Sequence, residues 1–394
     1  FEPYSIRYLA ELKELSKIFI VSDRMMYKLG YVDRVMDVLK HRRNEVEIEI
    51  FIDVEPDPSV QTVQKGLAVM NTFGPDNIIA IGGGSAMDAA KIMWLLYEHP
   101  EVDFFDLKQK FIDLRKRAFK FPTMGKKARM ICIPTTSGTG SEVTPFAVIS
   151  DKETGKKYPL ADYSLTPSVA IVDPMFTMSL PKRAIADTGL DVLVHAVEAY
   201  TSVMANEFTD GLAREGVKLV FENLVNSYNG DLVAREKMHN AATIAGMAFA
   251  SAFLGVDHSM AHKVGAAFHL PHGRCVAILL PHVIRYNGTK PKKLSMWPKY
   301  NIYVADQRYQ QLAQMVGLKA DTPAEGVEAL AQAVEKLMKE TGTVTGFKDC
   351  GIEEKAWMDK VPEMALLAFE DQCSPANPRI PMVHDMEAML KAAY

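Results

Sequence analysis

The stretch that decides the fold of this chain is Ile78-Ile79-Ala80-Ile81-Gly82-Gly83-Gly84-Ser85-Ala86-Met87-Asp88. Four apolar residues predict a buried strand, three glycines a tight turn, and the residues from Ala86 onward a helix start. Backbone N–H groups at such a turn and helix N-terminus can bind a phosphate, and Ser85 can cap the helix and donate a hydrogen bond. The triplet lacks the G-x-G-x-x-G spacing of the dinucleotide fingerprint, so a simple tight turn is the alternative.

Other short apolar runs on either side of this stretch alternate with helical patterns. These runs are Ile18 to Val21, Val46 to Phe51, Ile131 to Ile133 and Val169 to Val172. The alternation predicts a parallel α/β sheet over residues 1–179. After Pro181, Ala-, Leu- and Met-rich helical patterns take over, beginning with Ala184 to Tyr200 and Thr209 to Asn226. We therefore expect two domains, 1–179 and an all-helical 180–394, which the length of 394 residues accommodates.

A second polar loop follows the Ile131 strand, in the segment Pro134 to Glu142. It gathers glycines with the hydroxyl groups of Thr135, Thr136, Ser137 and Thr139. One or two of these hydroxyls are explained by helix capping, but the loop has more polar groups than capping requires. Two such loops favour a phosphate-binding site.

Asp23 follows the Ile18 strand. There its carboxylate can accept hydrogen bonds from an adenosine ribose and would repel a 2′-phosphate, which favours NAD over NADP.

Five residues in apolar surroundings have the spacing of metal ligands. Asp191 and His195 lie four apart in one predicted helix, and His258 and His262 repeat that spacing before His272. The first pair alone is more typical of a helix ion pair. Because unpaired ionisable groups are costly to bury, all five together predict one divalent cation, and ligands without thiolate suit Fe(II) or Zn(II). Glu198 shares the stripe of Asp191 and could orient a ligand, but we interpret it as a solvated residue.

Composition excludes several other classes. A formal net charge of −4 gives no global attraction to nucleic acid, and four widely spaced cysteines form no zinc-knuckle pattern and suit the cytoplasm. The longest apolar run, Ala241 to Val256, is too short for a membrane span and predicts a buried helix. The basic segment Lys108 to Arg129 has phenylalanines at helical spacing, so we expect a subunit or interdomain contact there rather than a nucleic-acid surface.

These motifs together resemble the iron-dependent (group III) alcohol dehydrogenases over nearly the whole chain. They are Gly82-Gly83-Gly84-Ser85 with Asp88, the Pro134 to Thr144 loop, Asp191 with His195, and His258 through His272. The segments Leu95 to Arg129 and Glu370 to Arg379 look most like the C-terminal alcohol dehydrogenase half of bacterial bifunctional aldehyde-alcohol dehydrogenases. The family begins with a further strand and a Phe-Gly-x-Gly turn, whereas this chain opens on Phe1-Glu2-Pro3-Tyr4, so we expect an excised part of a longer protein.

The resemblance implies a dehydroquinate synthase-like fold, with an NAD-binding α/β domain and an all-α metal-binding domain. It implies Asp191, His195, His258 and His272 as ligands of one ion, Fe(II) by family with Zn(II) possible, and His262 as a proton relay. The implied cofactor positions are Asp23, Gly83, Gly84, Ser85, Asp88, Thr135, Thr136, Ser137, Thr139 and Lys157, with Phe249 near the nicotinamide. Lys157 and Phe249 rest on the resemblance alone.

The function that follows is the reversible reduction of acetaldehyde, or a similar short aldehyde, to ethanol by NADH. A related polyol dehydrogenase and an assembly module of the bifunctional protein are the alternatives. We expect a homo-oligomer, fused to an N-terminal aldehyde dehydrogenase half, with no nucleic-acid or membrane partner.

Overall fold

A computed structural model describes residues 1–103, 107, 121–152, 156–292, 294 and 300–394. The chain forms two compact units, Phe1–Ser179 and Leu180–Tyr394. The basic segment that begins at Lys108 lies largely outside the described residues, and so does the contact expected there.

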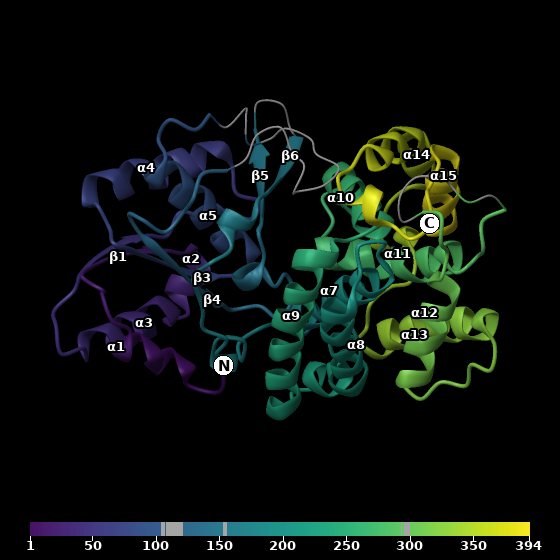
Figure 1. Cartoon of the computed structure of the whole chain (residues 1–394), viewed down its shortest axis with the longest axis horizontal. Coiled ribbons are helices and arrows are strands. Elements are labelled where there is room, and N and C mark those ends of the chain that lie inside the picture. The colour runs from purple at the N-terminus through teal and green to yellow at the C-terminus, as the bar shows by residue number, and fades with distance from the viewer. Residues whose placement is uncertain (104–106, 108–120, 153–155, 293, 295–299) are drawn as a thin grey trace. The chain divides into compact units, whose positions relative to one another are not determined.

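The first unit contains a five-stranded parallel sheet (Figure 1). Its strands, in sheet order, are β2 (Glu47–Phe51), β1 (Lys17–Val21), β3 (Asn77–Gly82), β4 (Arg129–Pro134) and β7 (Val169–Ala170). Every neighbouring pair is parallel. The predicted strands are confirmed, each within two residues of its expected ends.

Helices cover both faces of this sheet because the central strands are apolar on both sides. Ile78 and Ala80 of β3 belong to one core, and Ile79 and Ile81 belong to the other. Helices α4 (Val60–Phe73) and α5 (Gly84–Glu98) pack into the first core, and α1 (Tyr8–Glu11) and α3 (Tyr31–Lys40) pack into the second (Figure 1). The short helix α2 (Arg24–Lys28) follows β1.

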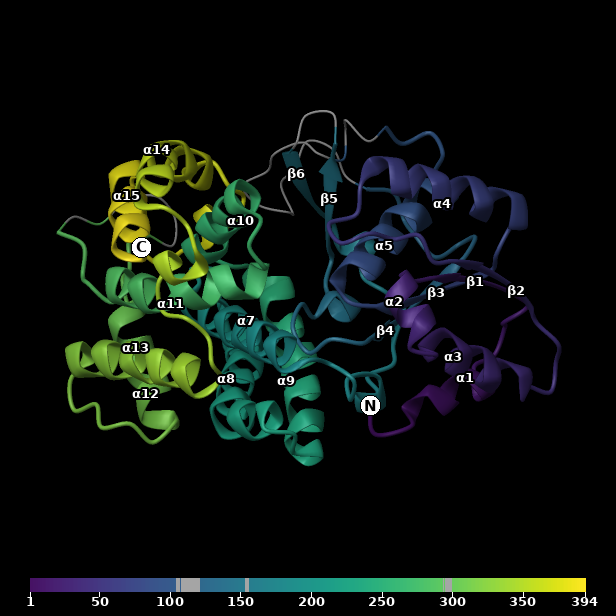
Figure 2. The same ribbon diagram turned by 180° about the vertical axis from the view of Figure 1, so that it is seen from behind.

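An antiparallel hairpin of β5 (Phe146–Asp151) and β6 (Lys156–Ala161) forms a separate small sheet (Figures 1 and 2). The sequence analysis did not predict it. Burial alternates along β5 instead of being continuous, and Pro159 within β6 removes a backbone donor. Both features weaken the signal of a buried strand.

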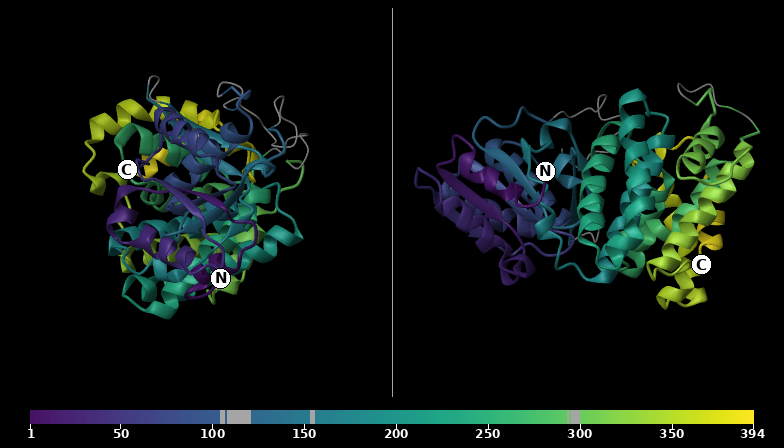
Figure 3. Two further views of the ribbon diagram at one scale, coloured as in Figure 1. Left: turned by 90° about the vertical axis from the view of Figure 1, so that its left-hand side faces the viewer. Right: turned by 90° about the horizontal axis from the view of Figure 1, so that it is seen from below.

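The second unit is helical, and no strand occurs among its described residues. Its helices are α7 (Lys182–Thr201), α8 (Glu207–Tyr228), α9 (Leu232–Ala252), α10 (Val256–Phe268), α11 (His272–Asn287), α12 (Ala305–Met315), α13 (Pro323–Glu340), α14 (Glu354–Phe369) and α15 (Val383–Ala392). Helix α7 is buried from Gly189 to Thr201, and it packs against α8 and α9 (Figure 3, right, teal).

The apolar run from Ala241 does not form one helix up to Val256. Helix α9 ends at Ala252, and Phe253 then adopts a left-handed φ of 61°. Buried Ala241, Ala245 and Ala248 confirm the close packing expected for the helical part. Among the described residues no single helix meets the length and apolarity of a bilayer span, and only the sharply bent pair α9 and α10 does so when taken together.

Candidate functional site

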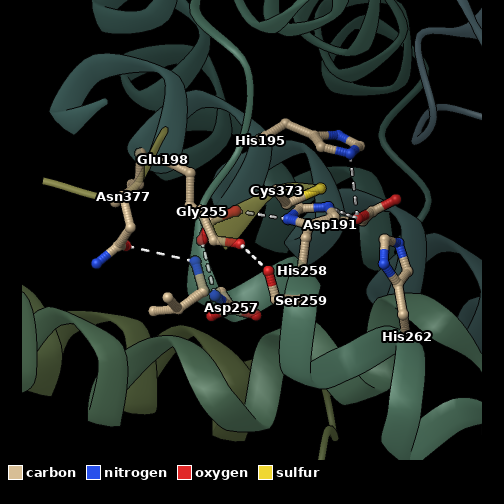
Figure 4. Close-up of polar contacts among 12 residues, drawn as sticks. Asp191, His195, Glu198, Gly255, Asp257, His258, Ser259, His262, Cys373 and Asn377 are labelled. Carbon is tan, nitrogen blue, oxygen red and sulfur yellow. Dashed lines mark hydrogen bonds and ion pairs between the residues drawn. The ribbon is translucent and has the colours of Figure 1, made fainter. Parts of the chain in front are cut away.

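Three imidazoles surround one carboxylate oxygen in the second unit. The Nε2 atoms of His195 and His272 both lie 3.6 Å from Asp191 Oδ1, and His258 Nε2 lies 3.7 Å from it. Asp191 and His195 come from α7, His258 from α10 and His272 from α11. Figure 4 shows His195 and His258 gathered around Asp191. The structure thus brings together all four residues that the resemblance implies as ligands.

These separations suit a shared cation better than hydrogen bonds. They exceed ordinary hydrogen-bond lengths, and Asp191 Oδ1 and His258 Nε2 are buried without a hydrogen-bond partner among the described residues. Donor atoms about 2.1 Å from a common tetrahedral ion would lie about 3.4 Å apart. The donor atoms of Asp191, His195 and His258 all lie within 4.8 Å of one another. The donor set therefore fits a divalent ion.

The electrostatics of this cluster favour a positive charge. Burial alone would raise the pKa of Asp191, but the facing imidazoles of His195 and His272 hold that pKa below its ordinary value. Burial alone would likewise lower the pKa of His258, yet the carboxylates of Asp191 and Glu198 raise it to about 10. Two buried carboxylates thus act on one imidazole, and a proton or a metal ion would offset their charge.

Glu198 is not a solvated helix residue, so that interpretation was wrong. It is 4% exposed, and its Oε2 accepts a hydrogen bond from His258 Nδ1 at 2.7 Å. Its Oε1 accepts the backbone N–H of Asp257 at 2.9 Å. Glu198 follows His195 by three residues on α7 and so faces the same buried side. It holds His258 with Nε2 directed at Asp191.

Two glycines allow the elements around this cluster to approach closely. A methyl group at Gly273 would lie 2.1 Å from the carbonyl oxygen of Asp187, so the start of α11 touches the backbone of α7. A methyl group at Gly255 would lie 2.7 Å from Glu198 Oε1. The sequence analysis singled out neither glycine, because the need for it comes from a distant segment.

His262 and Phe249 lie against two imidazoles of the Asp191 cluster. His262 stacks on His272 with ring centroids 5.5 Å apart, and its Nδ1 lies 3.3 Å from Asp371 Oδ2. Phe249 stacks on His195 with centroids 4.4 Å apart. The His262 ring is one turn beyond His258 on α10 (Figure 4).

In the first unit, the two glycine- and hydroxyl-rich loops converge. They follow β3 and β4, which are parallel neighbours, and Thr135 N donates to Gly82 O at 3.0 Å. A methyl group at Gly84 would lie 2.9 Å from Thr139 Cγ2, and one at Gly83 would lie 3.4 Å from Thr136 Cγ2. Both loops lie at the carboxyl edge of the sheet, where parallel α/β sheets bind ligands.

Other predicted cofactor residues lie on these loops or are linked to them. Thr135 and Ser137 are buried, and the Thr135 hydroxyl has no hydrogen-bond partner among the described residues. Lys157 lies on β6, and its ammonium is 2.6 Å from Asp57 Oδ2. The backbone N–H of Asp57 in turn donates to Ser85 Oγ at 3.4 Å. Lys157 is thus connected to the glycine turn through Asp57.

Both carboxylate oxygens of Asp88 accept hydrogen bonds from within the protein. Its Oδ1 accepts from Ser141 Oγ at 2.8 Å, and its Oδ2 accepts from Val148 N at 2.9 Å. Lys91, one turn later on α5, is fully buried and donates to Ser141 Oγ, Thr144 O and Phe146 O. Burial raises the pKa of Asp88 and lowers that of Lys91. Together they hold the second loop, and the sequence analysis had not considered Lys91.

Asp23 is the N-cap of α2. Its Oδ1 accepts the backbone N–H groups of Met25 and Met26. Its Oδ2 would lie 3.5 Å from a methyl group at Gly82, which places this oxygen beside the glycine turn. One carboxylate oxygen therefore caps a helix while the other faces the turn.

Comparisons with known proteins match both units of the chain to one family. Residues 1–174 match the model described as iron-containing alcohol dehydrogenase, and residues 185–394 match the C-terminal model of the Fe-containing alcohol dehydrogenase family. The iron-containing alcohol dehydrogenase of Thermococcus thioreducens has a TM-score of 0.89 at 32% identity, covering 100% of this chain and 97% of that one. The resemblance inferred from the sequence is confirmed.

Curated relatives include proteins of two lengths. Aldehyde-alcohol dehydrogenase 2 of Entamoeba histolytica is 89% identical over 100% of this chain, which spans 45% of that protein. NADPH-dependent butanol dehydrogenase of Clostridium saccharobutylicum is 42% identical over 99% of this chain and 94% of its own length. This chain thus spans about half of the first relative and nearly all of the second.

Proposed function

Because this chain belongs to the family of iron-containing alcohol dehydrogenases, we propose that it interconverts short primary alcohols and aldehydes, ethanol and acetaldehyde foremost, with NAD as hydride carrier. The observation that carries the proposal is the convergence of three imidazole nitrogens on Asp191 Oδ1 at 3.6–3.7 Å. A polyol dehydrogenase related to dehydroquinate synthase would use fewer histidines around its ion. A role in assembly alone would not require this donor set.

Asp191, His195, His258 and His272 would hold one divalent ion, Fe(II) by family and Zn(II) as the second choice. Such an ion would supply Lewis-acid stabilisation of an alcohol or aldehyde oxygen. Glu198 keeps His258 oriented by accepting its Nδ1 hydrogen bond. Phe249 covers one face of His195 and so excludes water from that side of the ligand.

His262 would accept the alcohol proton in oxidation and return it in aldehyde reduction. Its ring stacks on His272, and it is partly exposed rather than sealed in the core. A general base must lie within reach of the reacting group without being consumed as a ligand. That position supports the relay role.

The converging loops of the first unit would bind the cofactor. Backbone N–H groups at Gly83, Gly84 and Ser85 stand at the start of α5, where a helix N-terminus attracts a phosphate. Thr135, Thr136, Ser137 and Thr139 would add hydroxyl donors. Lys157 would reach the same turn if Asp57 released it, and Asp88 would act through Ser141.

NAD rather than NADP is supported by Asp23, whose Oδ2 faces the glycine turn. A carboxylate there would accept bonds from ribose hydroxyls and repel a 2′-phosphate. The name of the butanol dehydrogenase relative specifies NADPH. The Asp23→Gly variant removes the carboxylate and so tests whether Asp23 sets the cofactor preference of this chain. We expect it to narrow the preference for NADH over NADPH, measured as the ratio of kcat/KM values.

We further infer that the chain is the alcohol dehydrogenase part of a bifunctional enzyme whose other part is an aldehyde dehydrogenase. The 45% coverage of the aldehyde-alcohol dehydrogenase relative supports this. Four free cysteines support a reducing cytoplasm. Phe208, with 86% of its surface exposed, is the kind of aromatic anchor that would support a homo-oligomer.

The test of the activity is NADH oxidation with acetaldehyde by the metal-free protein before and after ferrous or zinc ion is added. We expect turnover only with the ion, and its loss on chelation. His272→Ala should abolish it, whereas His384→Ala, at a side chain that is 79% exposed, should not. Full turnover by His272→Ala would contradict the metal assignment.

A further inference from the structure

Asp371 is a buried carboxylate that none of the roles above uses. Its side chain is 2% exposed, and Oδ2 lies 3.3 Å from His262 Nδ1 and 2.7 Å from Lys263 Nζ. Its other oxygen accepts the backbone N–H of Cys373 at 3.0 Å. Asp371 follows α14, so it approaches His262 from an element that contributes none of the four ligands.

The donor atoms of His262, Asp371 and Cys373 lie within 4.8 Å of one another, so they could also form a second ion site. Lys263 argues against that interpretation. Its ammonium already neutralises the Asp371 carboxylate at 2.7 Å, and a cation would have to displace it. The cluster is better described as an imidazole oriented by an ionised carboxylate.

The orientation decides which ring nitrogen of His262 is available. A carboxylate can only accept, so the hydrogen of His262 lies on Nδ1 when that atom bonds to Asp371. Nε2 then keeps its lone pair. The ring is held nearly parallel to His272, at an interplanar angle of 18°, and its centroid lies 6.1 Å from that of His258. The acceptor nitrogen is therefore fixed beside the ligand cluster.

We propose that Asp371 is the positioning residue of His262, holding its hydrogen on Nδ1 so that Nε2 can accept the substrate proton. This inference rests on the relay role given to His262 in the proposed function. Lys263 keeps Asp371 charged and in place. Cys373 contributes its backbone N–H, and its thiol takes no part.

A double-mutant cycle of Asp371→Asn and His262→Ala tests this, with the intact chain loaded with ferrous ion. Asn keeps the size of the side chain and can still accept from Cys373 N. We expect Asp371→Asn to lower kcat at least about 10- to 100-fold with little change in KM, since that is the range for outer-shell hydrogen-bond partners at metal sites. In the His262→Ala background the same substitution should have no further effect. Asp359→Asn, an exposed change on α14, is the matched control.

Two readouts that do not depend on turnover accompany the cycle. In metal-free protein labelled with ¹⁵N-histidine, the His262 ring should show one tautomer, with Nδ1 protonated, and Asp371→Asn should mix the two. Metal analysis should give one ion per chain in both proteins. A second ion that is lost in Cys373→Ser would overturn the positioning role in favour of a metal site.

The possible failures can be told apart. If His262→Ala leaves kcat unchanged, the relay in the proposed function is wrong. If His262→Ala lowers kcat while Asp371→Asn does not, or if the two effects multiply, His262 keeps its role and the inference about Asp371 fails.

Discussion

Glu198 Oε2 accepts a hydrogen bond from His258 Nδ1 at 2.7 Å, across 60 residues of sequence. This contact joins α7 to α10 behind the Asp191 cluster and determines which nitrogen of His258 faces that cluster. A carboxylate that bonds to the far nitrogen of a ligand imidazole fixes its tautomer and increases its basicity. The buried pair would therefore orient His258 for the proposed ion before that ion binds.

Replacing Glu198 with Gln should weaken ion binding 10- to 100-fold, because the amide cannot supply the negative charge that makes His258 basic. Competition with a fluorescent chelator measures the dissociation constant. Glu222→Gln, an exposed change on α8, is the matched control and should leave the constant unchanged. Equal affinities in the two variants would contradict the role given to Glu198.

Asp191→Asn keeps the shape of the side chain and removes the charge on which three imidazoles converge. We expect the purified variant to contain less than about a tenth of the metal of the parent, because a carboxylate is the only anionic ligand among the four. Thermal unfolding provides a second measure. A chelator should lower the midpoint of the parent protein and leave that of Asp191→Asn in place.

Lys91→Met removes the cation that holds the second loop of the first unit and leaves Asp88 buried without it. The substitution also leaves Thr144 O and Phe146 O without the ammonium donor, and each buried acceptor left unsatisfied costs about 1–3 kcal/mol. Urea unfolding should show that loss, and quenching of protein fluorescence should show weaker NADH binding. Lys65→Met, on the exposed side of α4, should change neither quantity.

His239 should make the protein less stable as the pH falls below 7. It is 1% exposed, and burial lowers its pKa to about 3 from an ordinary 6.5. Because the folded-state pKa is the lower one, the unfolded chain binds more protons between these values, and stability is lost as pH falls through that window. From pH 7 to pH 5 the loss attributable to His239 is about 2 kcal/mol.

His239→Gln isolates this contribution. Denaturant unfolding at pH 7 and pH 5 should show a smaller pH dependence in the variant than in the parent. His384→Gln, at an exposed position, serves as the control, and its free energy of unfolding should show the same pH dependence as that of the parent. Identical pH dependences in all three proteins would contradict the assignment.

The sheet could be predicted because its central strands are buried on both faces, which makes them continuous apolar runs such as Ile78 to Ile81. The hairpin could not, because β5 is only partly buried and β6 contains a proline. The end of α9 at Ala252 also escaped prediction. Phe253 adopts a φ of 61° and a ψ of −174° there, a conformation for which glycine is the usual sequence signal.

The site could be found in the sequence because Asp191 with His195, and His258 with His262, are each four residues apart, so a single helix places each pair on one face. The carboxylates that hydrogen-bond to these histidines could not be found in the sequence. Asp371 lies 109 residues from His262, and Glu198 lies 60 from His258. Long-range contacts of this kind leave no periodicity in a single sequence. Glu198 was misjudged for that reason, and Lys91 was not considered.

The contact between Gly273 and the Asp187 carbonyl has a consequence for ion selectivity. A methyl group would lie 2.1 Å from that oxygen, so main chain rests on main chain where α11 meets α7. A main-chain contact has no side-chain rotamer that could relieve a change in spacing, so we expect the helices that carry Asp191 and His272 to keep their separation whatever the radius of a bound ion. Calcium, which takes six to eight oxygen ligands at about 2.3–2.6 Å, should be rejected by this rigid frame as well as by its nitrogen donors.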